Sequence, residues 1–353
     1  MSHPLKLAAY RTARLLGCFA LARWCNRKHL RILAYHGFAR TDEARFRSKL
    51  FINPDTFARR LDLLRRRNYR VLPLGTGLTD LATGCLRPNS VVITIDDGYA
   101  STLHLAAPLL HARSMPATVY LTSYHAKTQT PVFDLMVGYL LWKTQQTGFD
   151  MAWPTGSALR HFPLETNSQS QATCDTLTAW GHGADTEAER VVLWQELARA
   201  TGTEADAERV SDAFRLLSPD EAKRIQSLGV EIALHTHRHR FPAERPDLCR
   251  QELQDNRDYL ERELGVQSAH FCYPSGVYSP EQFSVLAEAG IISATTCDTG
   301  LVRRGDSYYD LARFLDGESV ADIEFEAEVS GFAELLRRLL RVNRRMTPMA
   351  TQS

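Results

Sequence analysis

Residues 91–99 read Val91-Val92-Ile93-Thr94-Ile95-Asp96-Asp97-Gly98-Tyr99, and this run constrains the fold more than any other. Five residues of high β propensity lead directly into two adjacent carboxylates and a glycine. Such an uninterrupted apolar run is typical of a strand buried on both faces of a parallel sheet. Side chains alternate along a strand, but a turn at Gly98 would let both acids face one cavity. An ordinary Asp-Gly turn is the alternative interpretation.

Similar apolar runs recur along the chain and alternate with helical patterns. The first run predicts a strand at Ser90–Ile95, and further strands are expected at Arg31–Tyr35, Ala117–Thr122, Val230–Leu234, Ser268–Tyr273 and Ile291–Thr296. Helices are expected at Pro54–Arg67, Ser101–Ala112, Asp247–Leu264 and Ser279–Ala289. Alternation of this kind predicts an α/β fold with a parallel sheet covered by helices.

One region departs from this rhythm. From about residue 126 to about 203 the strand pattern is lost, and polar segments (155–185) separate two helical stretches, Val132–Lys143 and Ala188–Arg199. We interpret this region as a helical insertion into one loop of a barrel. Loops at the carboxyl ends of barrel strands form active sites, so the insertion either covers a site or contacts a partner.

The composition is that of a globular protein. The chain has 353 residues, 44% of them hydrophobic, and its 42 Lys and Arg against 41 Asp and Glu leave a formal charge of +1. This balance excludes a disordered chain and a polyanion binder acting through bulk charge, and there is no nucleic-acid motif. Seven scattered cysteines without a CxxC pair argue against a disulfide framework or a thiolate zinc site, and favour a reducing compartment.

Both ends of the chain are basic and amphipathic. Residues 1–30 intersperse cations with Leu, Phe and Trp, and residues 316–353 include the similar run Gly331–Met346. Neither a signal peptide nor a membrane-spanning segment is recognisable, because arginines interrupt the apolar stretch at the N-terminus. We therefore expect a cytoplasmic protein. The two ends are expected either to pack as surface helices or to make peripheral contact with the inner membrane.

Histidines follow a second apolar strand. Residues 231–239 read Glu231-Ile232-Ala233-Leu234-His235-Thr236-His237-Arg238-His239. His235 and His239 are four residues apart, so a helical turn after the strand would place both rings on one side. Two imidazoles and one carboxylate are a common ligand set for Zn²⁺ or a similar divalent ion. The spacing of His237 directs its ring away from the other two, so we do not expect it to be a ligand. The alternative interpretation is a structural role, which is usual for a single buried histidine.

These motifs together resemble those of the NodB-homology polysaccharide deacetylases (carbohydrate esterase family 4). Thr94–Gly98 is similar to the family's TFDDG motif, and His235-Thr236-x-x-His239 to its H[ST]xxH motif. Phe271–Gly276 is similar to the FxYPxG form of its third motif, and Ala34-Tyr35-His36 to the YH signature of its circularly permuted branch. The resemblance covers about residues 31–315 apart from the insertion.

The resemblance implies a distorted (β/α) barrel and hydrolysis of an N-acyl group on a sugar. It implies Asp97, His235 and His239 as ligands of a divalent metal, expected to be Zn²⁺, and Asp96 as the catalytic base. By analogy with the permuted branch, His36 is the general acid. The turn formed by Tyr273, Pro274, Ser275 and Gly276 would bind substrate and donate to the oxyanion, while Thr236 would support the histidine loop.

The chain departs from the family pattern in several places. Cys272 stands near the position of an arginine that orients the base in the common third motif, and no late Leu-x-x-His segment is present. Asp97 and His235 are separated by 138 positions, which is wider than is usual in the family, and the insertion explains the difference. Asp310 and Arg313 could close the site or could form an ordinary surface pair.

Three functions are compatible with these observations. The first is a metal-dependent hydrolase that removes an N-acetyl group from an acetamido sugar of a bacterial polysaccharide, including exopolysaccharides, or of a lipid-linked saccharide. The second is a deformylase of an aminosugar linked to polyprenyl phosphate. The third is a carbohydrate-binding module that kept the barrel without catalysis.

Overall fold

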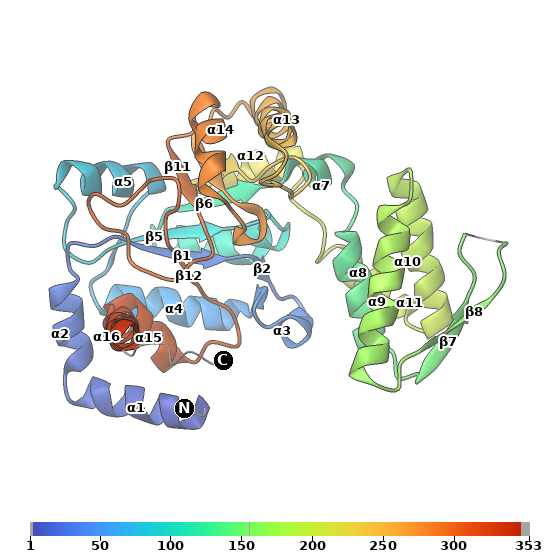
Figure 1. The fold of residues 1–353 in the computed structure, drawn as a ribbon, viewed down its shortest axis with the longest axis horizontal. Helices are drawn as coiled ribbons and strands as arrows, with labels where there is room; N and C mark the ends of the chain where they lie inside the picture. Colours follow the sequence, from blue (N-terminus) through green and yellow to red (C-terminus); the bar gives the residue numbers. More distant parts are fainter. Residues whose placement is uncertain (1–2, 155, 347–353) are drawn as a thin grey trace, which may run out of the picture.

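A parallel sheet of eight strands forms the centre of the molecule (Figure 1). The structure is a computed structural model and describes residues 3–154 and 156–346. The strand order is β11-β10-β9-β6-β5-β1-β12, with β4 also paired to β5. The bounds are β1 Arg31–Tyr35, β4 Arg70–Val71, β5 Ser90–Ile95, β6 Ala117–Leu121, β9 Val230–Leu234, β10 His270–Cys272, β11 Ser293–Thr295 and β12 Phe314–Leu315.

Strand β5 is fully buried and lies near the middle of the sheet. All six of its side chains are inaccessible, as expected for a strand covered on both faces. It pairs in parallel with β1 from Val91 to Ile95 and with β6 at its carboxyl end. The structure confirms the predicted strand. A run of β-branched residues without a charged position fits best inside the sheet, where Thr94 Oγ1 finds a partner in the Leu33 carbonyl.

The sheet curls until its two ends meet. Strand β12 pairs with β1, and Leu311, just before β12, forms a parallel bridge with Thr295 of β11. The segment from Leu311 to Leu315 therefore closes the ring, and the predicted distorted (β/α) barrel is confirmed.

Helices cover the outside of the barrel, and aliphatic and aromatic side chains fill the space between them and the sheet. The helices of the barrel are α3 Glu43–Phe46, α4 Pro54–Arg66, α5 Leu74–Thr83, α6 Ala107–His111, α7 Ser123–Thr128, α12 Pro219–Ser227, α13 Pro246–Leu264 and α14 Phe283–Glu288. A π-helical turn, Thr102–Ala106, precedes α6. Two short strands, β2 Gly37–Phe38 and β3 Phe51–Ile52, pair beside the barrel.

The two ends of the chain pack on each other. Helices α1 (His3–Leu15) and α2 (Cys18–Cys25) contact α15 (Asp322–Ser330) and α16 (Phe332–Met346) at the lower left of Figure 1. A small separate core forms there from Tyr10, Phe19, Ile323, Ala327 and Ala333. The rest of the basic C-terminal segment, residues 347–353, lies outside the described residues, as do residues 1–2.

The insertion is a distinct lobe at the right of Figure 1. It consists of α8 (Phe133–Lys143), α9 (Asn167–His182), α10 (Glu187–Thr201) and α11 (Glu204–Ser211), together with an antiparallel hairpin of β7 (Gly148–Met151) and β8 (Arg160–Pro163).

Two expectations for this lobe were wrong. The region does contain strands, and the polar segment before residue 185 contains α9. This helix has few apolar residues, but Thr166 and Gln169 form a capping box at its start, which is the sequence signal that indicates it.

All seven cysteines are free thiols. No helix in the described ranges combines the length and apolarity that a bilayer crossing requires.

Candidate active site

The carboxyl end of β5 places two acids at the mouth of the barrel. The Asp96 N–H still donates to the Tyr35 carbonyl at 2.8 Å, so Asp96 continues the pairing of β5 with β1. The chain then turns through left-handed conformations at Asp97 (φ 66°) and Gly98 (φ 86°). A Cβ at residue 98 would lie 2.4 Å from Leu121 Cδ1, so the turn requires glycine.

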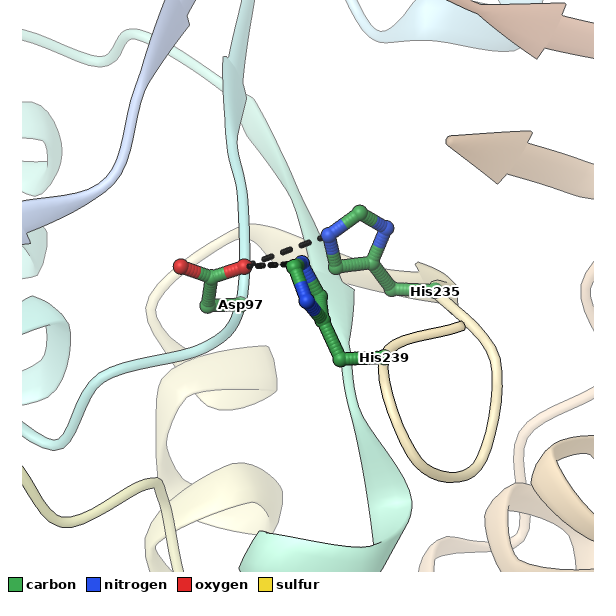
Figure 2. A group of neighbouring side chains, drawn as sticks. All are labelled: Asp97, His235 and His239. Carbon is green, nitrogen blue, oxygen red and sulfur yellow. Dashed lines mark hydrogen bonds and ion pairs between the residues drawn. The ribbon is translucent and has the colours of Figure 1, made fainter. Parts of the chain in front are cut away.

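Asp97 meets two histidines from the loop after β9. Asp97 Oδ1 lies 3.2 Å from His235 Nε2 and 3.3 Å from His239 Nε2 (Figure 2). The predicted helical turn between the histidines is absent. Instead, Thr236 (φ 66°) and His239 (φ 55°) adopt left-handed conformations, and the resulting tight loop brings the second ring back toward the first.

The three side chains fit a divalent cation. One ligand atom from each lies within 4.8 Å of the others. With both rings neutral, two nitrogen lone pairs and a carboxylate oxygen face a common point, and such acceptors repel unless a cation lies between them. A proton can bridge only one pair, whereas a divalent ion can bind all three atoms, and two nitrogens with one oxygen suit Zn²⁺.

The neighbours of His235 orient its ring. The Cys272 carbonyl accepts from His235 Nδ1 at 2.8 Å, which leaves the Nε2 lone pair directed at Asp97. The buried Asn256 side chain accepts from the His235 N–H at 2.9 Å and donates to the Leu121 carbonyl at 3.0 Å. Sequence reasoning missed Asn256, although a polar residue on the apolar stripe of α13 with Leu253 and Leu260 was a usable signal.

The electrostatics of the triad favour a bound cation. Burial alone would raise the pKa of Asp97, but the hydrogen bonds of His235 and His239 outweigh burial and hold this pKa well below its usual value. Burial likewise opposes protonation of His235, but the hydrogen bond and charge of Asp97 raise the pKa of the ring. The site therefore attracts positive charge, and a metal ion would displace that proton.

Asp96 is held by a buried arginine from the segment that closes the barrel. Arg313 Nη1 donates to Asp96 Oδ1 and Nη2 donates to Asp96 Oδ2, each at 2.7 Å. Both residues are almost fully buried. Burial would raise the pKa of Asp96, but the charge and hydrogen bonds of Arg313 outweigh it and lower this pKa. Asp96 is therefore ionised at neutral pH.

Arg313 is not part of a surface pair, and that alternative was wrong. Its guanidinium also donates to the Thr296 carbonyl at 2.8 Å and to Thr94 Oγ1 at 3.0 Å. Arg313 Nη2 lies 3.2 Å from Cys272 Sγ. Cys272 is the residue that stands near the arginine position of the common third motif described above. The guanidinium thus reaches that place from another part of the chain.

His36 lies on the other side of Asp96. It follows the last residue of β1, and His36 Nε2 is 3.7 Å from Asp96 Oδ2. The electrostatic interaction with His36 contributes to the lowered pKa of both Asp96 and Asp97, although it is not the main cause for either. The structure thus brings His36 together with the two acids.

The turn at residues 273–276 has a single free backbone donor. The Tyr273 N–H donates to the Thr295 carbonyl, the Gly276 N–H donates to the Tyr273 carbonyl, and Pro274 has no N–H. The Tyr273 side chain is buried and its hydroxyl donates to the Tyr309 carbonyl, so it does not face solvent. Only the exposed Ser275 has an amide hydrogen without an acceptor among the described residues.

Thr236 and His237 stabilise the histidine loop from behind. Thr236 Oγ1 accepts from the Arg240 N–H at 3.2 Å, and the Thr236 carbonyl accepts from the Ser123 N–H at 3.4 Å. His237 Nδ1 lies 2.9 Å from Ser123 Oγ and takes no part in the triad.

A cavity of about 700 Å³ opens beside Asp97 and His239. The insertion forms its opposite wall with Phe133, Asp134, His182, Glu187 and Arg190. The lobe is anchored at this mouth, because the Leu217 N–H donates to the Gly98 carbonyl at 2.8 Å. A more open hollow of about 910 Å³ elsewhere holds neither triad residues nor Asp96, so volume alone would not locate the site.

Comparison with known proteins identifies the family. A sequence model of the family described as polysaccharide deacetylase matches residues 83–293, more than half of the chain. The matched span contains both acids, the triad histidines and the 273–276 turn, but neither His36 nor Arg313. A comparison with curated proteins gave no match.

Solved structures share the fold. The deacetylase PplD of Streptococcus pyogenes, solved with acetate, has 17% identity and a TM-score of 0.56, with 85% of this chain and 98% of that chain covered. IcaB from Ammonifex degensii has 18% identity and a TM-score of 0.53, with coverages of 87% and 97%. A de-N-acetylase from Aggregatibacter actinomycetemcomitans has 15% identity and a TM-score of 0.54, with coverages of 84% and 98%. The chain belongs to the polysaccharide deacetylase family, hydrolases that act on amide bonds of sugars.

Proposed function

We propose that this protein is a metal-dependent hydrolase that removes the N-acetyl group from an acetamido sugar of a polysaccharide or lipid-linked saccharide. The observation that carries the proposal is the arrangement of Asp97, His235 and His239 around one point, with a second, ionised carboxylate beside them. Asp97, His235 and His239 would hold the ion, with Zn²⁺ as the first candidate. When bound, the ion would polarise the amide carbonyl and lower the pKa of water.

Asp96 has the properties of a general base. Its pairing with Arg313 keeps it ionised, so it can accept the proton of a water molecule that attacks the amide carbonyl. The guanidinium also fixes the plane of the carboxylate, since both oxygens are hydrogen-bonded in a bidentate pair. Arg313 is thus proposed as a positioning residue that acts through Asp96.

His36 is proposed as the general acid. Amine departure requires a proton on the sugar nitrogen, because an amide anion is a poor leaving group. The His36 side chain is largely buried beside Asp96 but retains some exposure toward solvent. It can therefore give a proton to the leaving nitrogen after Asp96 has accepted one from water.

The Ser275 N–H is proposed as the backbone donor to the oxyanion. The tetrahedral intermediate carries negative charge on the former carbonyl oxygen, which a fixed N–H group stabilises. Ser275 adopts a left-handed conformation (φ 56°) in the turn that follows β10. Of residues 273–276, which were all expected to bind the oxyanion, we therefore propose only the backbone N–H of Ser275 as the donor.

The size and walls of the cavity favour a substrate that is short or that binds through its end, rather than the middle of a long polymer. The insertion walls one side of the space beside the triad, and about 700 Å³ is a size typical of pockets for small ligands. We therefore favour a short, terminal or lipid-linked saccharide over an internal unit of a finished polymer.

Amine release from oligomers of N-acetylglucosamine tests this proposal. The protein loaded with Zn²⁺ should release amine and acetate, a chelator should abolish release, and added metal should restore it. Asp96→Asn should still bind metal but should lose activity by about 10²–10⁴-fold.

Substrate and binding controls separate the alternatives. Turnover of N-formyl but not N-acetyl sugars would support a deformylase instead. Metal binding without turnover of any acylated sugar would support a binding module and would contradict the proposal.

A further inference from the structure

The corner between α1 and α2 exposes large apolar side chains. Leu15 and Leu16 at the end of α1 are 83% and 76% exposed, and Leu21 and Trp24 of α2 are 62% and 61% exposed. We call these four residues the amino-terminal patch. Helix α16, which contacts α2, also exposes two leucines, Leu339 and Leu340.

Packing against the protein does not explain the patch. The inner faces of α1 and α2 already bury Tyr10, Phe19 and Ala22 against α15 and α16. The residues of the patch lie on the outer side, where the left-handed Gly17 turns the chain. Helices that are apolar on a second, outward face mark a surface that contacts something else.

The charged side chains of α1, α2 and the turn after them all carry one sign. Residues 1–41 contain no Asp or Glu, while α1, α2 and the turn after them contribute Lys6, Arg11, Arg14, Arg23, Arg27 and Lys28. Lys6 and Arg14 pair with Glu324 and Glu326 of α15. The other four cations make no ion pair within the part of the chain that the structure describes.

This charge distinguishes between two occupants. A second copy of the chain would bring the same cations face to face without acids between them, which disfavours a symmetric dimer through the patch. An anionic lipid surface offers negative headgroups to the cations and hydrocarbon to the leucines and the tryptophan. Arg27 stacks on the Trp24 ring at 4.5 Å, which combines both features at one point.

We propose that the amino-terminal patch binds the protein peripherally to an anionic membrane surface. The patch then lies opposite the active site, because the chain passes from α2 into the amino end of β1, whereas the site lies at the carboxyl ends of the strands (Figure 1). The six residues of β5 span about 20 Å. A membrane-bound enzyme would therefore act on sugars held away from the bilayer, such as the distal units of a lipid-linked saccharide.

Vesicle flotation of the full chain tests the proposal. The protein should float with vesicles of phosphatidylcholine and phosphatidylglycerol but not with phosphatidylcholine alone, and high salt should weaken the binding. Leu16→Glu combined with Trp24→Glu should lower the partition coefficient at least about tenfold, and Arg11→Gln with Lys28→Gln should lower it by about the same factor.

Leu159→Glu is the matched control, because Leu159 is 74% exposed but lies between β7 and β8 of the insertion. It should float like the unchanged protein. Circular dichroism should show that all variants are folded, since every altered side chain is on the surface. Absence of flotation with anionic vesicles, or equal loss in Leu159→Glu, would overturn the proposal. So would light scattering that shows a dimer broken by Leu16→Glu and Trp24→Glu.

Discussion

The charged side chains at the two edges of the parallel sheet differ in burial and in pairing. At the carboxyl edge, Asp96 and Arg313 are almost inaccessible, the Asp97 side chain is only 15% exposed, and each has a partner at hydrogen-bond distance. At the amino edge, four of the six cations of α1, α2 and the turn after α2 have no acidic partner among the described residues, and the exposed leucines and Trp24 lie on the same elements.

This difference predicts how tolerant each edge is to substitution. Charges in a buried, low-dielectric site depend strongly on one another, and removing one leaves the other uncompensated. Exposed charges interact weakly with the rest of the protein, so their removal changes the free energy of unfolding little. We therefore expect catalysis and folding to depend on the carboxyl edge and surface attachment to depend on the amino edge.

The largest effect is expected for Asp97→Ala. It removes the only carboxylate of the triad, so the two imidazoles would retain little metal affinity. Activity should fall at least about 10³-fold, since the Lewis acid supplies several kcal/mol of transition-state stabilisation. Bound metal per protein and amine release should be measured on the same sample.

Asp150→Asn provides the control for Asp97→Ala. Asp150 lies in β7 of the insertion, outside the cavity beside the triad, and its carboxylate pairs with His161 Nδ1 at 2.8 Å. It should keep its metal and most of its activity. Full metal content in Asp97→Ala would contradict the assignment of the triad.

The next effect concerns His36→Ala. If His36 protonates the leaving amine, its loss should lower kcat on an acetamido sugar by about 10²-fold. Hydrolysis of 4-nitrophenyl acetate should be nearly unchanged, because that leaving group departs without a proton. Equal losses on both substrates would contradict a role as the acid, and unchanged metal content shows that the triad is intact.

Local sequence predicted the parts of the site that lie on strands. Strands β1, β5 and β9 match their expected bounds, because short, largely apolar runs of β-forming residues are best accommodated at the centre of a sheet. Parallel strands bring their carboxyl ends to one edge, so Asp97 and His235 meet despite a sequence separation of 138 positions. The positions of these catalytic candidates thus follow from the fold class.

The partners of these residues could not be predicted in the same way. Arg313 reaches Asp96 across 217 positions, from a short segment whose place in the barrel depends on the closure of the sheet. Nothing in the sequence near Arg313 distinguishes a buried arginine from an exposed one. The polar helix α9 and the β7–β8 hairpin were missed because packing within the insertion stabilises them more than local propensity does.

A third prediction concerns Arg313→Met. Loss of the guanidinium leaves the buried Asp96 carboxylate uncompensated, so the free energy of unfolding near neutral pH should fall by about 3–5 kcal/mol. The pKa of Asp96, now lowered by Arg313, should rise above its ordinary value because burial then dominates. The acidic limb of kcat/KM should move to higher pH, with about tenfold lower activity near neutrality.

The stability of the two proteins should respond to pH with opposite signs. In the unchanged protein the pKa of Asp96 is lowered on folding, so its contribution exists above the unfolded pKa and is lost as pH falls through the folded pKa. In Arg313→Met the folded pKa is raised, so stability should instead be lost as pH rises.

Arg60→Met is the matched control for Arg313→Met, because Arg60 is another buried arginine, paired with Asp316 at 3.1 Å. It should also lower stability but leave the pH profile of catalysis in place. A displaced profile in both variants would show that Arg313 has only a structural role.

The smallest effect on catalysis is expected at the amino edge. Trp24→Glu alters an exposed side chain about one sheet length from Asp97, so the free energy of unfolding should change by no more than about 0.5 kcal/mol. With a soluble oligomer as substrate, kcat and KM should change less than about twofold, because the new carboxylate is screened by solvent at that distance. With substrate embedded in anionic vesicles, the rate should fall, since the protein no longer concentrates at the surface. A loss of kcat on the soluble oligomer would show that the two edges are coupled and that the separation of attachment from catalysis is wrong.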